Sequence, residues 1–207
     1  PHSRAATFTV TKFSDTNDGT CNADCSLREA ILAANGNGQA DTITLGAGTY
    51  QLSLAGPNED AAATGDLDIA AATVLTISGL GPSQTIIDGG GLDRIFHIRL
   101  GATVVISGVT ITNGFLSVLD TTGGGIRNEG SLRLINTLVT SNTTTQSGGG
   151  IYNLSGGLLQ LINSAVINNV APSFGAGINT TNAGTVILTN SIISNNRATG
   201  SSSSQGG

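Results

Sequence analysis

Short segments in which apolar and polar residues alternate recur at a fixed interval along the second half of the chain. Three of them are Leu134-Ile135-Asn136-Thr137, Leu161-Ile162-Asn163-Ser164 and Leu188-Thr189-Asn190-Ser191, each 27 residues after the last. Alternation indicates a β-strand, because successive side chains of a strand point to opposite faces. A fixed repeat of this length indicates units that stack on their neighbours. The sequence therefore predicts an all-β solenoid of parallel strands with one coil per repeat.

Aliphatic residues return at the same positions of successive repeats, as expected for columns that form a buried core. These columns are Val104, Leu132, Leu159 and Val186; Ile106, Leu134, Leu161 and Leu188; and Ile111, Val139, Val166 and Ile193. Leu75 and Ile77 add an earlier coil to the first two columns. Each coil has one residue between its members of the first and second columns. These residues, Val105, Arg133, Gln160 and Ile187, are expected to face outward.

Asparagine and glycine mark the turns between these strands. One series is Asn136, Asn163 and Asn190, and a second is Asn142, Asn169 and Asn196. Asparagine tolerates a left-handed backbone better than most residues, and stacked amides can hydrogen-bond from coil to coil. We expect an asparagine ladder at Asn136, Asn163 and Asn190 that is structural and binds no ligand.

The first 60 residues differ from the repeats and are expected to form a strand and helix cap. Ala6 to Phe13 reads as a strand. Ser26 and Glu29 have the spacing of a capping box, and Asn35-Gly36 would end the helix. A helix this short must pack on other elements, so we place it over the open front end of the solenoid. Residues 61–207 would form the coils of the same single domain, with no helix to cap the rear end.

Composition narrows the possible partners. The chain of 207 residues has a net charge of −5, and Lys12 is its only lysine, which argues against a nucleic-acid partner. No apolar run approaches the length that crosses a membrane. Cys21 and Cys25 could form a small disulfide ring or remain free thiols; the disulfide reading favours an oxidising, extracellular setting. Zinc would need about four ligands and the two histidines are distant, so we expect no metal and no cofactor.

A resemblance to a known family begins at Cys21 and continues through Cys25-Ser26-Leu27-Arg28-Glu29-Ala30. This string is similar to the CSLREA domain of bacterial secreted and surface proteins, and the similarity covers about residues 7 to 115. The blocks Gly123-Gly124-Gly125-Ile126 and Gly148-Gly149-Gly150-Ile151 resemble repeats of polymorphic outer-membrane-type adhesins. The resemblance implies a right-handed parallel β-helix of the pectin-lyase-like kind, a solenoid of three sheets. It implies no reaction.

A polysaccharide lyase or hydrolase is the alternative that this fold invites, although fold alone does not decide function. Hydrolysis of a glycoside needs two carboxylates, and Asp66 with Asp68, two apart on a strand, is the best pair. Asp88, Asp93 and Arg94 are the next candidates. Aspartates beside glycines are common turn residues, however, and the repeats hold few aromatic residues for stacking on sugars. The strand pattern places His97 outward, as an ordinary surface residue.

The function that these patterns favour is mechanical. We expect a secreted, non-catalytic module that displays a surface, adheres to a cell surface or glycan, or builds a fibre. The uncapped rear end would meet the front of another copy or continue into further coils of a longer surface protein.

Overall fold

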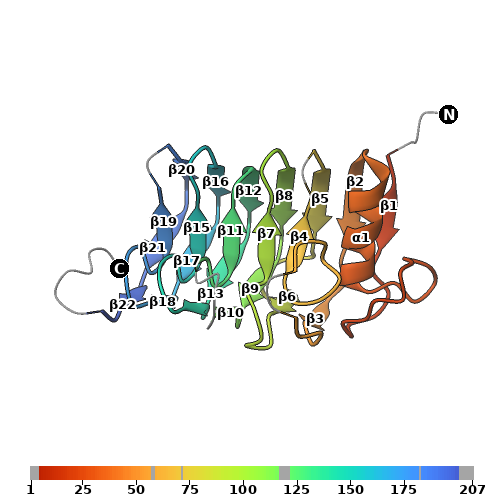
Figure 1. Ribbon diagram of the computed structural model, residues 1–207, viewed down its shortest axis with the longest axis horizontal. Helices are drawn as coiled ribbons and strands as arrows, with labels where there is room; N and C mark the ends of the chain where they lie inside the picture. The colour runs from red at the N-terminus through yellow and green to blue at the C-terminus, as the bar shows by residue number, and fades with distance from the viewer. Residues whose placement is uncertain (1–4, 57–58, 71, 117–121, 182, 201–207) are drawn as a thin grey trace.

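The computed structural model shows a parallel β-solenoid and describes residues 5–56, 59–70, 72–116, 122–181 and 183–200. Strands stack side by side along the long axis, with β1 and α1 at one end and β20, β21 and β22 at the other (Figure 1). Among these residues all the strand pairs are parallel, and they form four sheets. The fold predicted from the repeats is therefore confirmed.

Sheet 1 has seven strands: β1 (Thr7–Thr9), β2 (Ala40–Thr44), β5 (Val74–Ser78), β8 (Thr103–Ser107), β12 (Ser131–Ile135), β16 (Leu158–Ile162) and β20 (Thr185–Thr189). Sheet 2 has six: β3 (Gly48–Gln51), β6 (Thr85–Asp88), β9 (Thr110–Thr112), β13 (Leu138–Thr140), β17 (Ala165–Ile167) and β21 (Ile192–Ser194). Sheet 3 has five: β4 (Leu67–Ile69), β7 (Phe96–Ile98), β11 (Ile126–Asn128), β15 (Ile151–Asn153) and β19 (Ile178–Thr180). Sheet 4 has four two-residue strands: β10 (Phe115–Leu116), β14 (Thr143–Thr144), β18 (Val170–Ala171) and β22 (Arg197–Ala198). The three sheets that the sequence predicts are thus the long ones, and the sequence does not predict the short fourth sheet.

The strand register confirms the predicted columns. Leu134 pairs with Leu161, and Leu161 pairs with Leu188, across sheet 1. The same sheet continues forward, where Ile43 pairs with Ile77 and Phe8 pairs with Ile43. Most of these inward side chains belong to one continuous buried cluster. The dry column of aliphatic side chains therefore runs through nearly the whole length of the solenoid.

The glycine clusters have a packing reason in addition to their turns. The first glycine of the cluster at 148–150 has a positive φ of 69°, in the left-handed region that favours glycine. A Cβ added at Gly150 would lie 2.6 Å from the carbonyl oxygen of Gly177 and 2.9 Å from Nδ2 of Asn169. The cluster lets adjacent coils approach this closely, and it leaves room for the Asn169 amide.

Helix α1 (Leu27–Asn37) lies at the amino-terminal end, where it packs against β4 and β2 (Figure 1). The predicted capping box is present: the amide of Glu29 donates to Oγ of Ser26, and the amide of Ser26 donates to Oε2 of Glu29. The expected end at Asn35-Gly36 is wrong, because the helix continues to Asn37 and ends at Gly38. Asn35 instead docks the helix on the next coil, donating to the carbonyl of Asp68.

The two ends of the solenoid differ in exposure. Inward residues of β20 and β21 have no following coil among the described residues, so Leu188 is 46% exposed whereas Leu161, one coil earlier, is fully buried. Ile193, which aligns with the buried Val166, is exposed as well. In the part of the chain that the structure describes, no helix covers this end.

Candidate functional site

The outer row of sheet 3 brings together charged residues from successive coils. Asp68 on β4 pairs with His97 on β7, and His97 pairs with Arg127 on β11. Their flanking residues, such as Phe96 and Ile98, point inward and are fully buried. Alternation along each strand therefore aims Asp68, His97 and Arg127 at the same outer face.

The expectation that His97 is an ordinary surface residue is wrong. It does face outward from its strand, but its side chain lies between two carboxylates and the residue is only 6% exposed. Nδ1 of His97 lies 3.1 Å from Oδ1 of Asp68, and Nε2 lies 3.3 Å from Oε1 of Glu129. The sequence pattern identified the face correctly but did not reveal what covers it.

The segment just before β4 is part of that cover. The amide of Ala62 donates to Oδ2 of Asp68, at 3.2 Å, and Asp68 is fully buried. Its other oxygen, Oδ1, accepts no hydrogen bond in the described residues. A buried carboxylate oxygen without a donor is costly, so Asp68 is held by its ionic neighbours.

Asp66 forms a second buried ion pair next to the first. Nε of Arg94 contacts Oδ2 of Asp66, and Nη1 of Arg94 donates to the carbonyl of Thr122. Burial raises the pKa of Asp66 to about 7; the Arg94 guanidinium opposes that rise, while the charges of Asp68 and Asp93 add to it. The structure therefore brings four predicted candidates together: Asp66, Asp68, Asp93 and Arg94.

Glu129, which directly follows β11 in the next coil, completes the cluster. It accepts a hydrogen bond of 2.8 Å from Nε of Arg127 and lies beside His97. Burial raises the pKa of Glu129, but the charge of His97 and the Arg127 hydrogen bond outweigh that effect, so the net shift is downward. Asp66 and Glu129 are thus two carboxyls in one cluster with opposite pKa shifts.

Asp60 and Arg99 close the outer side of the cluster. Nη1 of Arg99 contacts Oδ1 of Asp60 and lies 3.9 Å from Oδ1 of Asp68. Asp60, Asp68 and His97 each offer a donor atom, and the three atoms lie within 4.8 Å of one another. These are residue types that bind metals, and nothing in their sequence spacing had indicated that they meet.

Asp88, the remaining catalytic candidate, lies elsewhere. It ends β6 in sheet 2, where its carboxylate accepts from the amide of Gly90 and from Nδ2 of Asn113. The bond to Gly90 is typical of an aspartate in a turn, as the sequence predicts for aspartates beside glycines.

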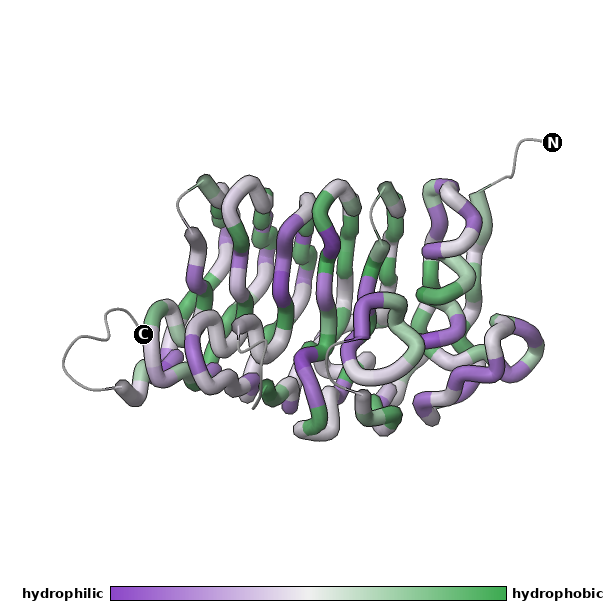
Figure 2. Tube along the Cα trace, viewed as in Figure 1, coloured by the Kyte–Doolittle hydropathy of each residue, from purple (hydrophilic) through white to green (hydrophobic). Residues whose placement is uncertain are grey.

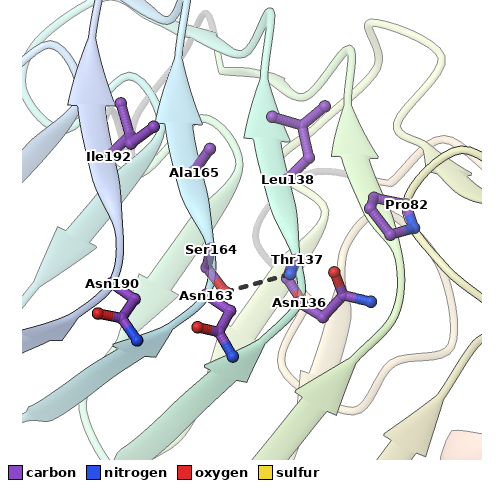
Figure 3. Close-up of a pocket in the computed structure, with 9 residues that line it drawn as sticks. All are labelled: Pro82, Asn136, Thr137, Leu138, Asn163, Ser164, Ala165, Asn190 and Ile192. Carbon is purple, nitrogen blue, oxygen red and sulfur yellow. Dashed lines mark hydrogen bonds between the residues drawn. The ribbon is translucent and has the colours of Figure 1, made fainter.

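The predicted asparagine ladder lies in a different series. Asn136, Asn163 and Asn190 do adopt the left-handed turn conformation, with φ of 47°, 49° and 48°. Their amides point away from the strands and line a shallow groove of about 380 Å³ (Figure 3). None of the three side chains forms a hydrogen bond among the described residues. The dashed bond in that view joins Oγ of Ser164 to the amide of Thr137.

Amide-to-amide bonds run instead through the buried second series. Nδ2 of Asn142 donates to Oδ1 of Asn169 at 3.0 Å, and Nδ2 of Asn169 donates to Oδ1 of Asn196 at 2.9 Å. Each of these two acceptor oxygens also receives the backbone amide of the preceding asparagine. This column is an asparagine ladder, and its role is structural; Nδ2 of Asn128 donates to Oδ1 of Asn153 in the same way in sheet 3.

A buried arginine anchors the front end and was missed by sequence reasoning. Arg28 on α1 is fully buried; its Nε and Nη2 donate to the two oxygens of Asp15, at 2.7 and 3.0 Å. It also donates to the carbonyls of Ala62, Gly65 and Asp66. Arg28 therefore ties the helix to the segment that covers Asp68. The only signal in the sequence was a lone arginine beside the apolar face of a short helix.

The hydrophilic loop before α1 carries the cysteine pair (Figure 2). Cys21 and Cys25 form a disulfide with their Cα atoms 4.5 Å apart, which settles the alternative left open by the sequence. Cys25 is fully buried and directly precedes Ser26, the first capping residue of α1. The bond therefore fixes the entry to the helix.

Comparison with known proteins adds no identification. No family model matches the chain, and neither a curated protein nor a solved structure matches it significantly. A search of the described helices finds none with the length and apolar character that crossing a membrane requires.

Proposed function

We propose that this chain is a non-catalytic structural or adhesive module of an extracellular surface, which associates through the ends of its solenoid. The observation that carries the proposal is the apolar rear end. Leu188 and Ile193 occupy positions that are buried in earlier coils, yet they are exposed here. Apolar surface of this kind is stabilised when a further layer of strands covers it.

Sheet 1 provides the matching surface at the other end. It begins with β1 and ends with β20, so each end carries a strand whose outer edge has no partner among the described residues. Pairing of β20 in one copy with β1 in the next would extend the sheet without changing its direction. Such a head-to-tail contact does not close on itself and builds a filament. A further coil of the same chain would cover the same edge in the same way.

Two residues of β20 offer a matched test. Leu188 points along the core column and Ile187 points outward, yet their exposed fractions are nearly equal, at 46% and 45%. The purified chain is examined by electron microscopy and by sedimentation over a range of concentrations. We expect head-to-tail chains that Leu188→Asp abolishes and Ile187→Asp preserves. Monodisperse monomers of the unaltered chain at high concentration would overturn the end-to-end contact.

Two features support an extracellular setting. The Cys21–Cys25 disulfide is the form that cysteines take in oxidising compartments. The resemblance of residues 7 to 115 to the CSLREA domain of bacterial secreted and surface proteins agrees with it. Protein recovered from its native source and analysed by mass spectrometry should show this bond; two free thiols there would contradict the extracellular assignment.

Polysaccharide cleavage is the second candidate function, because Asp66 has the raised pKa that a general acid requires. Asp66 is buried against Arg94, and Asp68 is fully enclosed, so this pair of carboxylates is not open to a sugar chain. We expect no cleavage of pectin, alginate or similar uronates with calcium present. An activity that Asp66→Ala or Asp68→Ala removes would reverse this ranking.

A further inference from the structure

We propose that Asp60, Asp68 and His97 form a binding site for one divalent transition-metal ion, for which Zn²⁺ is the best match. The site lies on the outer face of sheet 3, between the segment before β4 and the strands β4 and β7. It is independent of the end-to-end contact proposed above, which uses β1 and β20.

The donor atoms are already gathered. One oxygen each of Asp60 and Asp68 and one nitrogen of His97 lie within 4.8 Å of one another. Zinc holds nitrogen and oxygen ligands at about 2.0–2.2 Å, so the ligand atoms of a tetrahedral site lie about 3.4 Å apart. Asp68 and His97 are already at 3.1 Å on paired strands. Only Asp60, on an exposed segment, has to move closer.

The buried oxygen of Asp68 is the independent sign of a ligand. Asp68 is fully buried, and its Oδ1 receives no hydrogen bond in the described part of the chain, although Nδ1 of His97 lies 3.1 Å away. Folded proteins rarely leave a carboxylate oxygen in this state unless it serves an ion or a function. A metal between Oδ1 of Asp68 and Nδ1 of His97 would satisfy both atoms.

Glu129 holds the second nitrogen of the same imidazole. Its Oε1 lies 3.3 Å from Nε2 of His97 and is fixed by a 2.8 Å hydrogen bond from Nε of Arg127. Histidine ligands of metals usually donate their other ring N–H to a carboxylate. That arrangement keeps the proton on Nε2 and leaves the lone pair of Nδ1 for the metal.

Arg99 marks the place that the cation would take. Its Nη1 contacts Asp60 and approaches Asp68 to 3.9 Å, yet it forms no hydrogen bond among the described residues. The Arg99 side chain is 31% exposed, so it can turn toward solvent when a doubly charged ion replaces it. The three carboxylates of Asp60, Asp68 and Glu129 outnumber the two guanidinium groups of Arg99 and Arg127 around the site, which favours the added charge.

The donor set selects the class of metal. An imidazole nitrogen with two carboxylate oxygens suits zinc and its neighbours, whereas calcium and magnesium prefer oxygen ligands alone. Three protein ligands leave a fourth position, on the side of the exposed Asp60, for water.

The test uses the chain treated with a chelator and titrated with Zn²⁺ by calorimetry in a buffer that does not bind metal. His2 and His97 are the only histidines, so a His2→Gln background assigns any imidazole effect to His97. We expect one Zn²⁺ per chain. Glu129→Gln should weaken binding about 10- to 100-fold, and Asp68→Asn should weaken it further. Asp88→Asn, outside the cluster, should leave the affinity unchanged.

A second measurement needs no substitution in the cluster, so it stands even if Asp68→Asn fails to fold. In ¹⁵N NMR of the His2→Gln chain, Zn²⁺ should shift the Nδ1 signal of His97 and leave a protonated Nε2. Absence of stoichiometric binding, an affinity unaffected by Asp68→Asn, or an imidazole that keeps protons on both nitrogens at saturating Zn²⁺ would each overturn the proposal.

Discussion

The front and rear coils share one strand lattice but bury their polar groups in different ways. The front coils bury charges: Arg28 with Asp15, Arg94 with Asp66, and His97 with Asp68. The rear coils contain no carboxylate after Glu129, and the polar groups buried there are neutral: asparagines such as Asn142 and Asn169, together with threonines and serines.

The difference follows from periodicity. An amide carries a donor and an acceptor, so a column of identical asparagines satisfies itself when each coil repeats the one before. A column of identical carboxylates would repel, so charges are buried only where a non-repeating segment supplies the opposite sign. In the front coils that segment is the loop and helix before β4. The rear coils therefore repeat the same buried residues, whereas each front coil has its own buried charge pair.

The largest expected effect comes from breaking a buried charge pair in the front. Arg28→Ala leaves Asp15 buried without its charged partner and removes a donor from three carbonyls. We expect a loss of about 3–5 kcal/mol in the free energy of unfolding, measured by chemical denaturation followed by circular dichroism.

Arg133→Ala is the matched control, because Arg133 is exposed on the outer face of sheet 1. Its cost should stay within about 0.5 kcal/mol. Equal effects of the two substitutions would show that the front coils do not depend on their buried charges.

A smaller loss is expected from interrupting the ladder of the rear coils. Asn169→Ala removes the acceptor of Asn142 and the donor to Asn196, and it removes one donor from each of the carbonyls of Val139 and Ile167. We expect a loss of about 2–4 kcal/mol in the free energy of unfolding.

Asn163→Gly serves as its control in the same coil. Asn163 is exposed, makes no side-chain hydrogen bond among the described residues, and has a positive φ that glycine adopts freely. We expect a change below about 1 kcal/mol. An equal loss of unfolding free energy at Asn163 and Asn169 would mean that the exposed series stabilises the fold as much as the buried series.

The smallest effect is a pH dependence confined to the front. The pKa of Asp66 is raised by burial, to about 7, so the folded chain holds this proton longer than the unfolded chain. The stabilisation from Asp66 is then complete below about pH 4 and is lost as the pH rises to about 7. Asp66→Asn lacks this titration. Relative to that variant, the wild type should lose about 1 kcal/mol of unfolding free energy per pH unit between pH 5 and 7.

Denaturation of both chains at pH 5, 6, 7 and 8 measures this slope. A wild type that gains stability over Asp66→Asn as the pH rises would show that Arg94 keeps Asp66 ionised in the folded chain. Asp88→Asn, at a turn of sheet 2, should show no such slope.

The chain pattern alone predicted the repeats, the inward columns and the helix cap. Leu134, Leu161 and Leu188 stack as expected, since a period-two pattern repeated every 27 residues allows few other arrangements. Ser26 and Glu29 were found because a capping box is local in sequence. The expectation of a ladder at Asn136, Asn163 and Asn190 is wrong. Both asparagine series repeat at the same interval, and only the series of Asn142, Asn169 and Asn196 faces inward.

Sequence by itself determined the solenoid, since its information is periodic and local. Only the tertiary structure decided which charges meet: Asp15 with Arg28, Asp66 with Arg94, and Asp68 with His97 and Glu129. These pairs link residues of separate coils, or link a loop to a helix or strand. They do not recur at a fixed interval, so the sequence pattern does not indicate them. Their contacts depend on how the covering segment before β4 lies over sheet 3, and a one-dimensional pattern does not contain that position.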